Sequence, residues 1–266
     1  MSRIEKTFVK VKQENRAALI AYITAGDPDI GTSKKLVLAL AESGTDIIEL
    51  GIPFSDPLAD GPTIQKASQR ALAKGTRLLD IIALVKELRK QTQIPLVFMS
   101  YYNPILQYGI KKFAQDAVNA GLDGVIVPDL PPEEAGELIT VARKTGLDTI
   151  FLLAPTSTQS RIKLVAESSK GFVYYVSLTG VTGARAKVAT DVSASIKKIK
   201  RATDKPIAVG FGISTPAQVR QVVNWGADGV IVGSAIVNLI EQNIGKKDLV
   251  NKVAQFVSKL AKGTKY

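Results

Sequence analysis

The sequence predicts a parallel α/β fold: a (β/α)8 TIM barrel with an extra N-terminal helix, forming a single domain over residues 1–266. Eight short apolar runs rich in β-forming residues alternate with stretches of helical periodicity in a chain of 266 residues, and one such barrel takes about 250 residues. The near-continuous apolar character of the runs suits strands that are buried on both faces of a parallel sheet. Eight alternating units favour a closed barrel over an open doubly wound sheet, and two small domains are the alternative on length alone.

The expected strands follow in chain order, and a helix over about residues 2–12 precedes them and is expected to cover the bottom of the barrel. The strands are Ala18–Thr24, Thr45–Leu50, Pro95–Tyr101, Asp123–Pro128, Leu147–Leu153, Gly171–Ser177, Lys205–Gly210 and Asp228–Gly233. Thr215 to Gln218 has the pattern of a capping box with proline at the first helical position, so it predicts the start of a helix. Asn103-Pro104 has the composition of a loop entry.

One phrase occurs twice. Residues 120–127 and 226–232 both contain a glycine that can end a helix, followed by an Asp-Gly step into a strand. The spacing of the eight units is uneven, so the phrase marks a repeated βα unit and not a solenoid.

The composition narrows the possible chemistry. The chain has no cysteine and no histidine, which excludes disulfides, thiolate chemistry, the Ser-His-Asp arrangement and the usual catalytic zinc sites. Acid–base work near neutral pH must come from Asp, Glu, Lys or Tyr. We expect no metal and no cofactor, although an oxygen-ligated cation such as Mg²⁺ is compatible with the composition.

The net charge of +11 fits nucleic acid, an anionic membrane, an anionic small substrate, or simply solvated helix faces. Lys197, Lys198 and Lys200 lie at the spacing of an exposed helix, and no nucleic-acid-binding motif accompanies them. The longest apolar runs are too short to span a bilayer, and the N-terminus has no signal-peptide pattern. We therefore expect no nucleic acid, no membrane and a cytoplasmic location.

In such barrels the active site lies at the C-terminal ends of the strands. Glu49 ends the second expected strand, where a buried carboxylate is costly unless it is paired or used. Its pKa should rise if it points into the barrel mouth, which suits a general acid–base. The alternative, a solvated glutamate at a strand end, is equally compatible with the sequence.

The loop after Glu49 holds a second carboxylate. Asp60 could reach the same site, and two carboxylates in different surroundings are a common acid–base arrangement. Ordinary loop chemistry is the alternative, because Asp60 and Gly61 precede Pro62, a probable first helical residue. Asp56, before Pro57, has the pattern of a turn residue.

Three glycine-rich segments follow the last three expected strands, where TIM barrels often bind phosphate. They contain Thr182 and Gly183, Phe211 and Gly212, and Gly233 and Ser234. Glycine lets backbone N–H groups approach an anion, and a helix N-terminus adds a favourable dipole. Each segment alone is also compatible with an ordinary turn.

Aromatic residues end several strands. Tyr101 and Tyr174, with Tyr22 and Phe211, could line a flat aromatic pocket. The alternative is that at least half of these side chains pack in the core or at the rim.

From about residue 4 to residue 260 the chain resembles the tryptophan synthase alpha subunit family. The resemblance rests on the long phrase IELGIPFSDPLADGPTIQ over residues 48–65, and on Gly180–Gly183 and Gly210–Ser214. The phrase TAGDP at residues 24–28 fits as well. The family's fold is the TIM barrel.

The resemblance implies a carbon–carbon lyase that converts indole-3-glycerol phosphate to indole and glyceraldehyde 3-phosphate without a cofactor. It implies a pyridoxal-phosphate-dependent beta subunit as partner in an alpha2beta2 complex, which condenses indole with serine. The family's positions place the catalytic groups at Glu49, Asp60 and Tyr174, the phosphate site at Gly183, Gly212, Gly233 and Ser234, and the partner contact near Asp56. They also imply mobile loops at 53–62 and 178–190, with Thr182 near Asp60 on closure.

The sequence departs from the family's pattern at one position, and three alternative functions compete with this reading. Leu178 stands where some members carry arginine, which bears on loop closure and not on the reaction. A stand-alone lyase that releases free indole shares the fold and site. Another phosphosugar enzyme is the second rival, although the missing histidine argues against metal-dependent epimerases, and the first six strands lack the lysine of a Schiff-base aldolase. The third, a basic nucleic-acid binder, predicts salt-sensitive DNA affinity.

Overall fold

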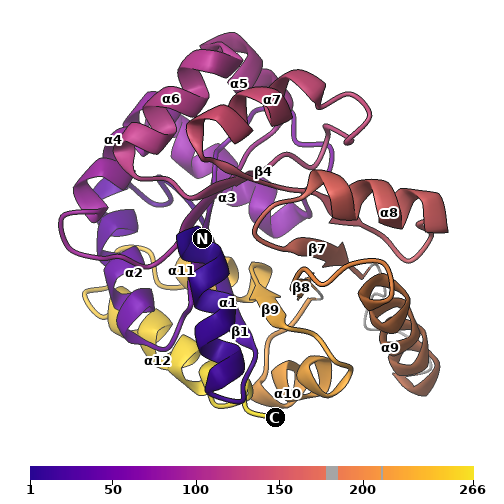
Figure 1. Cartoon of the computed structure of the whole chain (residues 1–266). Helices are drawn as coiled ribbons and strands as arrows, with labels where there is room; N and C mark the ends of the chain where they lie inside the picture. The colour runs from indigo at the N-terminus through magenta and orange to yellow at the C-terminus, as the bar shows by residue number, and fades with distance from the viewer. Residues whose placement is uncertain (178–184, 211) are drawn as a thin grey trace.

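The computed structural model describes residues 1–177, 185–210 and 212–266, and the side chains of all of these except 185–191. Within these ranges a ring of helices surrounds one parallel sheet (Figure 1). The strands are β1 (Ala18–Thr24), β2 (Ile47–Gly51), β3 (Leu96–Met99), β4 (Gly124–Ile126), β5 (Asp148–Ile150), β6 (Leu152–Leu153), β7 (Val173–Val176), β8 (Ile207–Gly210) and β9 (Gly229–Val232). The helices are α1 (Arg3–Gln13), α2 (Ile30–Glu42), α3 (Pro62–Ala73), α4 (Leu78–Leu88), α5 (Tyr102–Tyr108), α6 (Ile110–Ala120), α7 (Gly136–Thr145), α8 (Gln159–Ser168), α9 (Arg185–Lys200), α10 (Pro216–Asn224), α11 (Ser234–Glu241) and α12 (Leu249–Ala261).

The predicted barrel is confirmed, with one change at the fifth expected strand. The run 147–153 forms two short strands, β5 and β6, on either side of Phe151. β5 pairs with β4, whereas β6 pairs with β7, and the strand order runs continuously from β5 through β1 to β6. A single stretch of chain therefore joins the two edges of the sheet, and it changes its hydrogen-bonding partner midway.

The repeated Asp-Gly phrase has a structural reason. The Asp123 carboxylate accepts a hydrogen bond from the backbone N–H of Leu96 at 2.8 Å, and Asp228 accepts one from Ile207 at 2.9 Å. Each aspartate thus ties the start of its own strand to the start of the preceding strand. The following glycine leaves room for α1, because a Cβ on Gly229 would lie 3.3 Å from the Phe8 ring.

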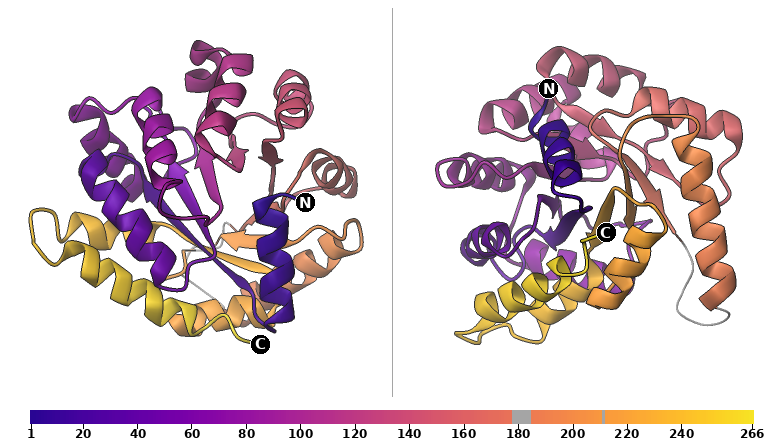
Figure 2. Two further views of the ribbon diagram at one scale, coloured as in Figure 1. Left: turned by 60° about the vertical axis from the view of Figure 1, so that its left-hand side comes forward. Right: turned by 60° about the horizontal axis from the view of Figure 1, so that its bottom comes forward.

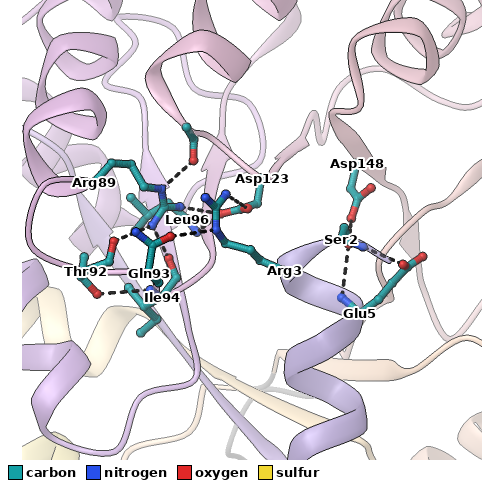
Figure 3. Close-up of polar contacts among 11 residues, drawn as sticks. Ser2, Arg3, Glu5, Arg89, Thr92, Gln93, Ile94, Leu96, Asp123 and Asp148 are labelled. Carbon is teal, nitrogen blue, oxygen red and sulfur yellow. Dashed lines mark hydrogen bonds and ion pairs between the residues drawn. The ribbon is translucent and has the colours of Figure 1, made fainter.

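Helix α1 covers the bottom of the barrel, as predicted (Figures 1 and 2). Its residues Ile4 and Phe8 pack among the inward-facing side chains of the strands. Ser2 caps the helix and donates a hydrogen bond to Asp148 at 2.6 Å, while Arg3 bonds to Asp123 at 2.9 Å (Figure 3). The extra N-terminal helix is therefore fixed by both apolar and charged contacts.

The helix starts are partly as predicted. Pro62 is the first residue of α3, and Thr215 caps α10 with the expected capping box. The prediction of a loop at Asn103-Pro104 is wrong, because both residues lie in the first turn of α5. A first turn tolerates proline, since its N–H groups have no partner within the helix. Asp129 accepts a hydrogen bond from the backbone N–H of Tyr102 at 2.9 Å and so supports this helix start.

Across the described ranges, none of the helices combines the length and apolarity that a membrane crossing requires.

Candidate active site

Glu49 lies inside the barrel. It is two residues beyond Ile47, which belongs to the interior cluster, so the alternation of a strand turns its side chain to the same side. Its side chain is 1% exposed, and neither carboxylate oxygen has a hydrogen-bond partner in the described part of the chain. The solvated glutamate of the alternative reading is therefore excluded.

Burial changes the charge state of Glu49. Loss of solvation, and then the nearby charge of Asp60, raise its pKa from 4.5 to about 8. Both effects disfavour the ionised carboxylate, since burial removes its hydration and a second anion repels it. The carboxyl is consequently protonated at neutral pH and poised to give up a proton.

Asp60 lies near the end of the loop between β2 and α3. The expected helix start at Pro62 is confirmed with Gly61 as its N-cap residue, so Asp60 does not cap α3. Burial raises the pKa of Asp60, and a hydrogen bond with Tyr101 opposes that rise. Its charge also raises the pKa of Tyr22 and Tyr174, which places it in the same site as Glu49.

Two buried tyrosines flank Glu49. Tyr22 is the direct strand partner of Glu49 in β1, and Tyr174 lies in β7. Burial, above all, raises the pKa of both hydroxyls, so both remain neutral. Glycines give them space: a Cβ on Gly51 would lie 2.0 Å from the Tyr22 hydroxyl oxygen, and one on Gly210 would lie 2.7 Å from that of Tyr174. The strand-end glycines thus shape the walls of the site.

Tyr101 is attached to the loop that carries Asp60. Its hydroxyl accepts a hydrogen bond from the backbone N–H of Ala59 at 2.8 Å, and its ring lies 5.3 Å from that of Phe54, centroid to centroid. Burial raises the pKa of Tyr101 to about 12. The side chain predicted to line the pocket therefore also holds the adjacent loop.

The predicted phosphate region is described in part. Gly212 follows β8 with φ of +41° in open space, and Gly233 is the N-cap residue of α11, packed against the Tyr22 ring. Ser234 opens the first turn of α11 and is exposed. Thr182, Gly183, Leu178 and Phe211 lie outside the described residues.

The predicted partner contact lies on the surface of the same loop. Asp56 is exposed and accepts a hydrogen bond from Ser55. Leu58, two residues away, is 89% exposed. An apolar side chain as exposed as this is compatible with a surface that a partner covers.

A partly buried ion-pair cluster beside the site was not predicted. Arg70 of α3 donates two hydrogen bonds to Asp27, at 2.8 and 2.9 Å, and one to Glu241 at 2.8 Å. A signal was present in the sequence, because Arg70 follows the buried Ile64 and Ala67 at helical spacing. An arginine at such a position calls for buried acidic partners.

A cavity of about 1300 Å³ lies at the opposite end of the barrel, beside α1, and contains none of the predicted site residues. Two of its basic residues pair with carboxylates: Arg16 pairs with Asp46, and Lys200 pairs with Asp228. Glu49 and its neighbours therefore remain the candidate site, at the end of the strands where barrel enzymes act.

The fold and the site define a class: a (β/α)8-barrel enzyme with one buried and one partly buried carboxylate at the C-terminal end of its barrel. The sequence model of the tryptophan synthase alpha chain matches residues 8–265. The chain belongs to this family.

Relatives and solved structures agree along the whole chain. The tryptophan synthase alpha chain of Geotalea uraniireducens is 54% identical over 265 residues, which cover 100% of this chain and 98% of the relative. That of Geobacter sulfurreducens is 55% identical, covering 98% of each. The crystal structure of tryptophan synthase subunit alpha from Legionella pneumophila superposes with a TM-score of 0.92 at 42% identity, covering 99% of this chain and 98% of the other.

The family assigns the overall activity. The chain is a lyase of tryptophan biosynthesis that cleaves indole-3-glycerol phosphate, and it works with a tryptophan synthase beta subunit.

Proposed function

We propose that Glu49 and Asp60 are the acid–base pair of this cleavage, and that Tyr174 assists them. The buried, unpartnered carboxyl of Glu49 carries the proposal. A carboxyl held without partners costs stability, and its raised pKa suits a general acid at neutral pH.

In the proposed reaction, protonated Glu49 gives its proton to C3 of the indole ring. The ring then carries a positive charge, and Asp60 stabilises it by accepting a hydrogen bond from the indole N–H. The ionised Glu49 next takes the proton of the glyceryl hydroxyl next to the ring. The carbonyl of glyceraldehyde 3-phosphate forms as the bond to indole C3 breaks, and the electron pair returns to the ring. Glu49 ends protonated, as it began.

The remaining predicted residues bind and orient the substrate. Tyr22, Tyr101 and Phe211 would flank the indole ring. The backbone of Gly183, Gly212 and Gly233, with Thr182 and Ser234, would bind the phosphate. Backbone N–H groups at the start of a helix suit an anion, and holding both ends of the substrate supplies orientation.

We further propose that the chain acts in the cytoplasm as a single domain over residues 1–266, in an alpha2beta2 complex. The beta subunit would contact the loop at Asp56 and receive the indole. The exposure of Asp56 and Leu58 on the loop that carries Asp60 supports this surface, because a partner there would act directly on the position of Asp60.

The test is indole release from indole-3-glycerol phosphate by the purified chain, with and without a beta subunit. Glu49→Gln should lower kcat by about 10²- to 10⁴-fold, the usual contribution of acid–base catalysis. Glu42→Gln, an exposed glutamate at the end of α2, is the matched control and should retain full turnover.

Three outcomes have distinct meanings. Wild-type turnover in Glu49→Gln would remove the role of Glu49. Release that the beta subunit accelerates supports the subunit reading, whereas fast release that is independent of the partner indicates a stand-alone lyase.

The wild-type kcat/KM should fall above pH 8, because Glu49 then loses its proton in the free enzyme.

A further inference from the structure

Arg70 connects the two helices that begin at the two halves of the proposed site. Helix α3 begins at Pro62, two residues after Asp60, and α11 begins at Ser234, directly after Gly233. The Arg70 guanidinium on α3 bonds to Glu241 at the end of α11. The same group grips Asp27 in the loop after β1 with two parallel hydrogen bonds.

The cluster is built to be rigid. The Asp27 side chain is 1% exposed, and that of Arg70 is 25% exposed. A paired, two-pronged contact between guanidinium and carboxylate fixes orientation as well as distance. Arg70 uses its remaining nitrogen on Glu241, so one side chain holds three segments of the barrel together.

Apolar packing between the same helices points the same way. Ile64 and Ala67 of α3 and Val237 of α11 form one buried cluster with Tyr22. Tyr22 is the strand partner of Glu49, and its ring contacts Gly233. The interface between α3 and α11 therefore sets the spacing between Asp60 and the start of α11. Arg70 adds a polar contact to this interface.

We propose that Arg70 is a positioning residue: through Asp27 and Glu241 it sets the distance between the half-site that holds the indole and the half-site that holds the phosphate. The inference rests on the proposed function. Arg70 itself need not touch the substrate. Its effect appears only when one molecule must occupy both half-sites at once, because a misplacement of about 1 Å can cost about 10²-fold in rate.

The test separates the intact substrate from its two halves. Arg70→Met should lower kcat/KM for indole-3-glycerol phosphate by about 10- to 100-fold. The inhibition constants of indole alone and of glycerol 3-phosphate alone should each stay within about twofold of the wild-type values, since each fragment needs only its own half-site. Arg161→Met is the matched control: Arg161 lies on α8 and pairs with the exposed Glu133, so its loss should change none of the three constants.

A second variant covers the case in which Arg70→Met does not fold. Glu241→Gln keeps the Arg70–Asp27 pair and weakens only the link to α11. It should show the same pattern at about 3- to 10-fold, because the neutral amide can still accept a hydrogen bond but lacks the charge that strengthens it. When Arg70→Met and Glu241→Gln are combined, their losses in kcat/KM should not multiply, because both substitutions break the same connection between α3 and α11.

Two results would overturn the inference: an unchanged kcat/KM in folded variants, or fragment constants that rise in parallel with the loss for the intact substrate. Failure of the proposed function is a separate result, since it shows as an active Glu49→Gln variant. An inactive Glu49→Gln variant together with an Arg70→Met variant of normal kcat/KM would reject the positioning role of Arg70 and leave the proposed function intact.

Discussion

Asp123 and Glu49 are both carboxylates buried in the same barrel, at its two ends. Asp123, at the N-terminal end, is 7% exposed, and Glu49, toward the C-terminal end, is 1% exposed. Asp123 receives hydrogen bonds from Arg3, Arg89 and the backbone N–H of Leu96. Glu49 receives none from the described residues.

The difference separates stability from chemistry. At the bottom Asp123 and Asp148 both have charged partners, and contacts from Ser2 and Arg3 fix α1 to the strands. At the top the fold bears the cost of a carboxyl without a partner among the described residues, since a cationic partner would hold the ionised form and remove the proton that the proposed reaction needs. Such a division is expected where activity requires a destabilised site.

The largest expected effect is on the bottom carboxylate. Asp123→Ala should lower the free energy of unfolding by about 3–5 kcal/mol, because it leaves the buried guanidinium of Arg89 without its carboxylate. Urea unfolding followed by circular dichroism measures the loss, and kcat per folded molecule should not change. Asp116→Ala, which removes an exposed pair with Lys112, should cost far less, because solvent screens an exposed ion pair. Equal losses in the two variants would contradict the contrast between the ends.

The next effect concerns the pH dependence of stability through Glu49. The folded chain keeps a proton up to about pH 8, whereas the unfolded carboxyl loses it near its ordinary value of 4.5. The unfolding free energy should therefore fall as pH rises through this window, by about 2 kcal/mol between pH 6 and 7.5. Glu49→Gln should lack this part of the fall. Parallel pH profiles for the two proteins would show that Glu49 is not protonated in the folded state.

The smallest effect is at the hydrogen bond that holds the top loop. Tyr101→Phe leaves the backbone N–H of Ala59 without its acceptor, which should cost about 0.5–1.5 kcal/mol, and it should lower kcat by loosening Asp60. Tyr108→Phe removes a hydroxyl that bonds to Asp116 on the outer helices. This control should show a similar change in stability and keep full activity. If Tyr108→Phe lost as much activity as Tyr101→Phe, Tyr101 would not act through the loop.

Much of the fold could be predicted because the strands are apolar on both faces and two of them begin at an Asp-Gly step. The change of strand partner at Phe151 could not be predicted, since hydrophobic periodicity records burial and does not show which neighbouring strand accepts the hydrogen bonds. Helix α5 was missed because Asn103-Pro104 fits a turn and a helical first turn equally well. The choice between them depends on Asp129, which is distant in sequence.

The candidate site divides in the same way. The cost of a carboxyl in an apolar strand made Glu49 a candidate beside an equal alternative, and the structure excluded the solvated alternative by showing a buried side chain. The sequence placed Arg70 at the helical spacing of buried residues but did not give its partners, because Asp27 lies 43 positions away and Glu241 lies 171 positions away. Tyr101 had a predicted place but not its contact with Ala59, which depends on how the loop folds back.

Helix α1 also has a consequence for synthesis of the protein. It is synthesised ahead of every strand, yet it packs against Phe172, which precedes β7, and beside Gly229 of β9. Ala17, just ahead of β1, donates its backbone N–H to the carbonyl of Thr264 at 2.9 Å. The apolar face of α1 is therefore made well before the surface that covers it, and it stays uncovered during synthesis until β9 has been made.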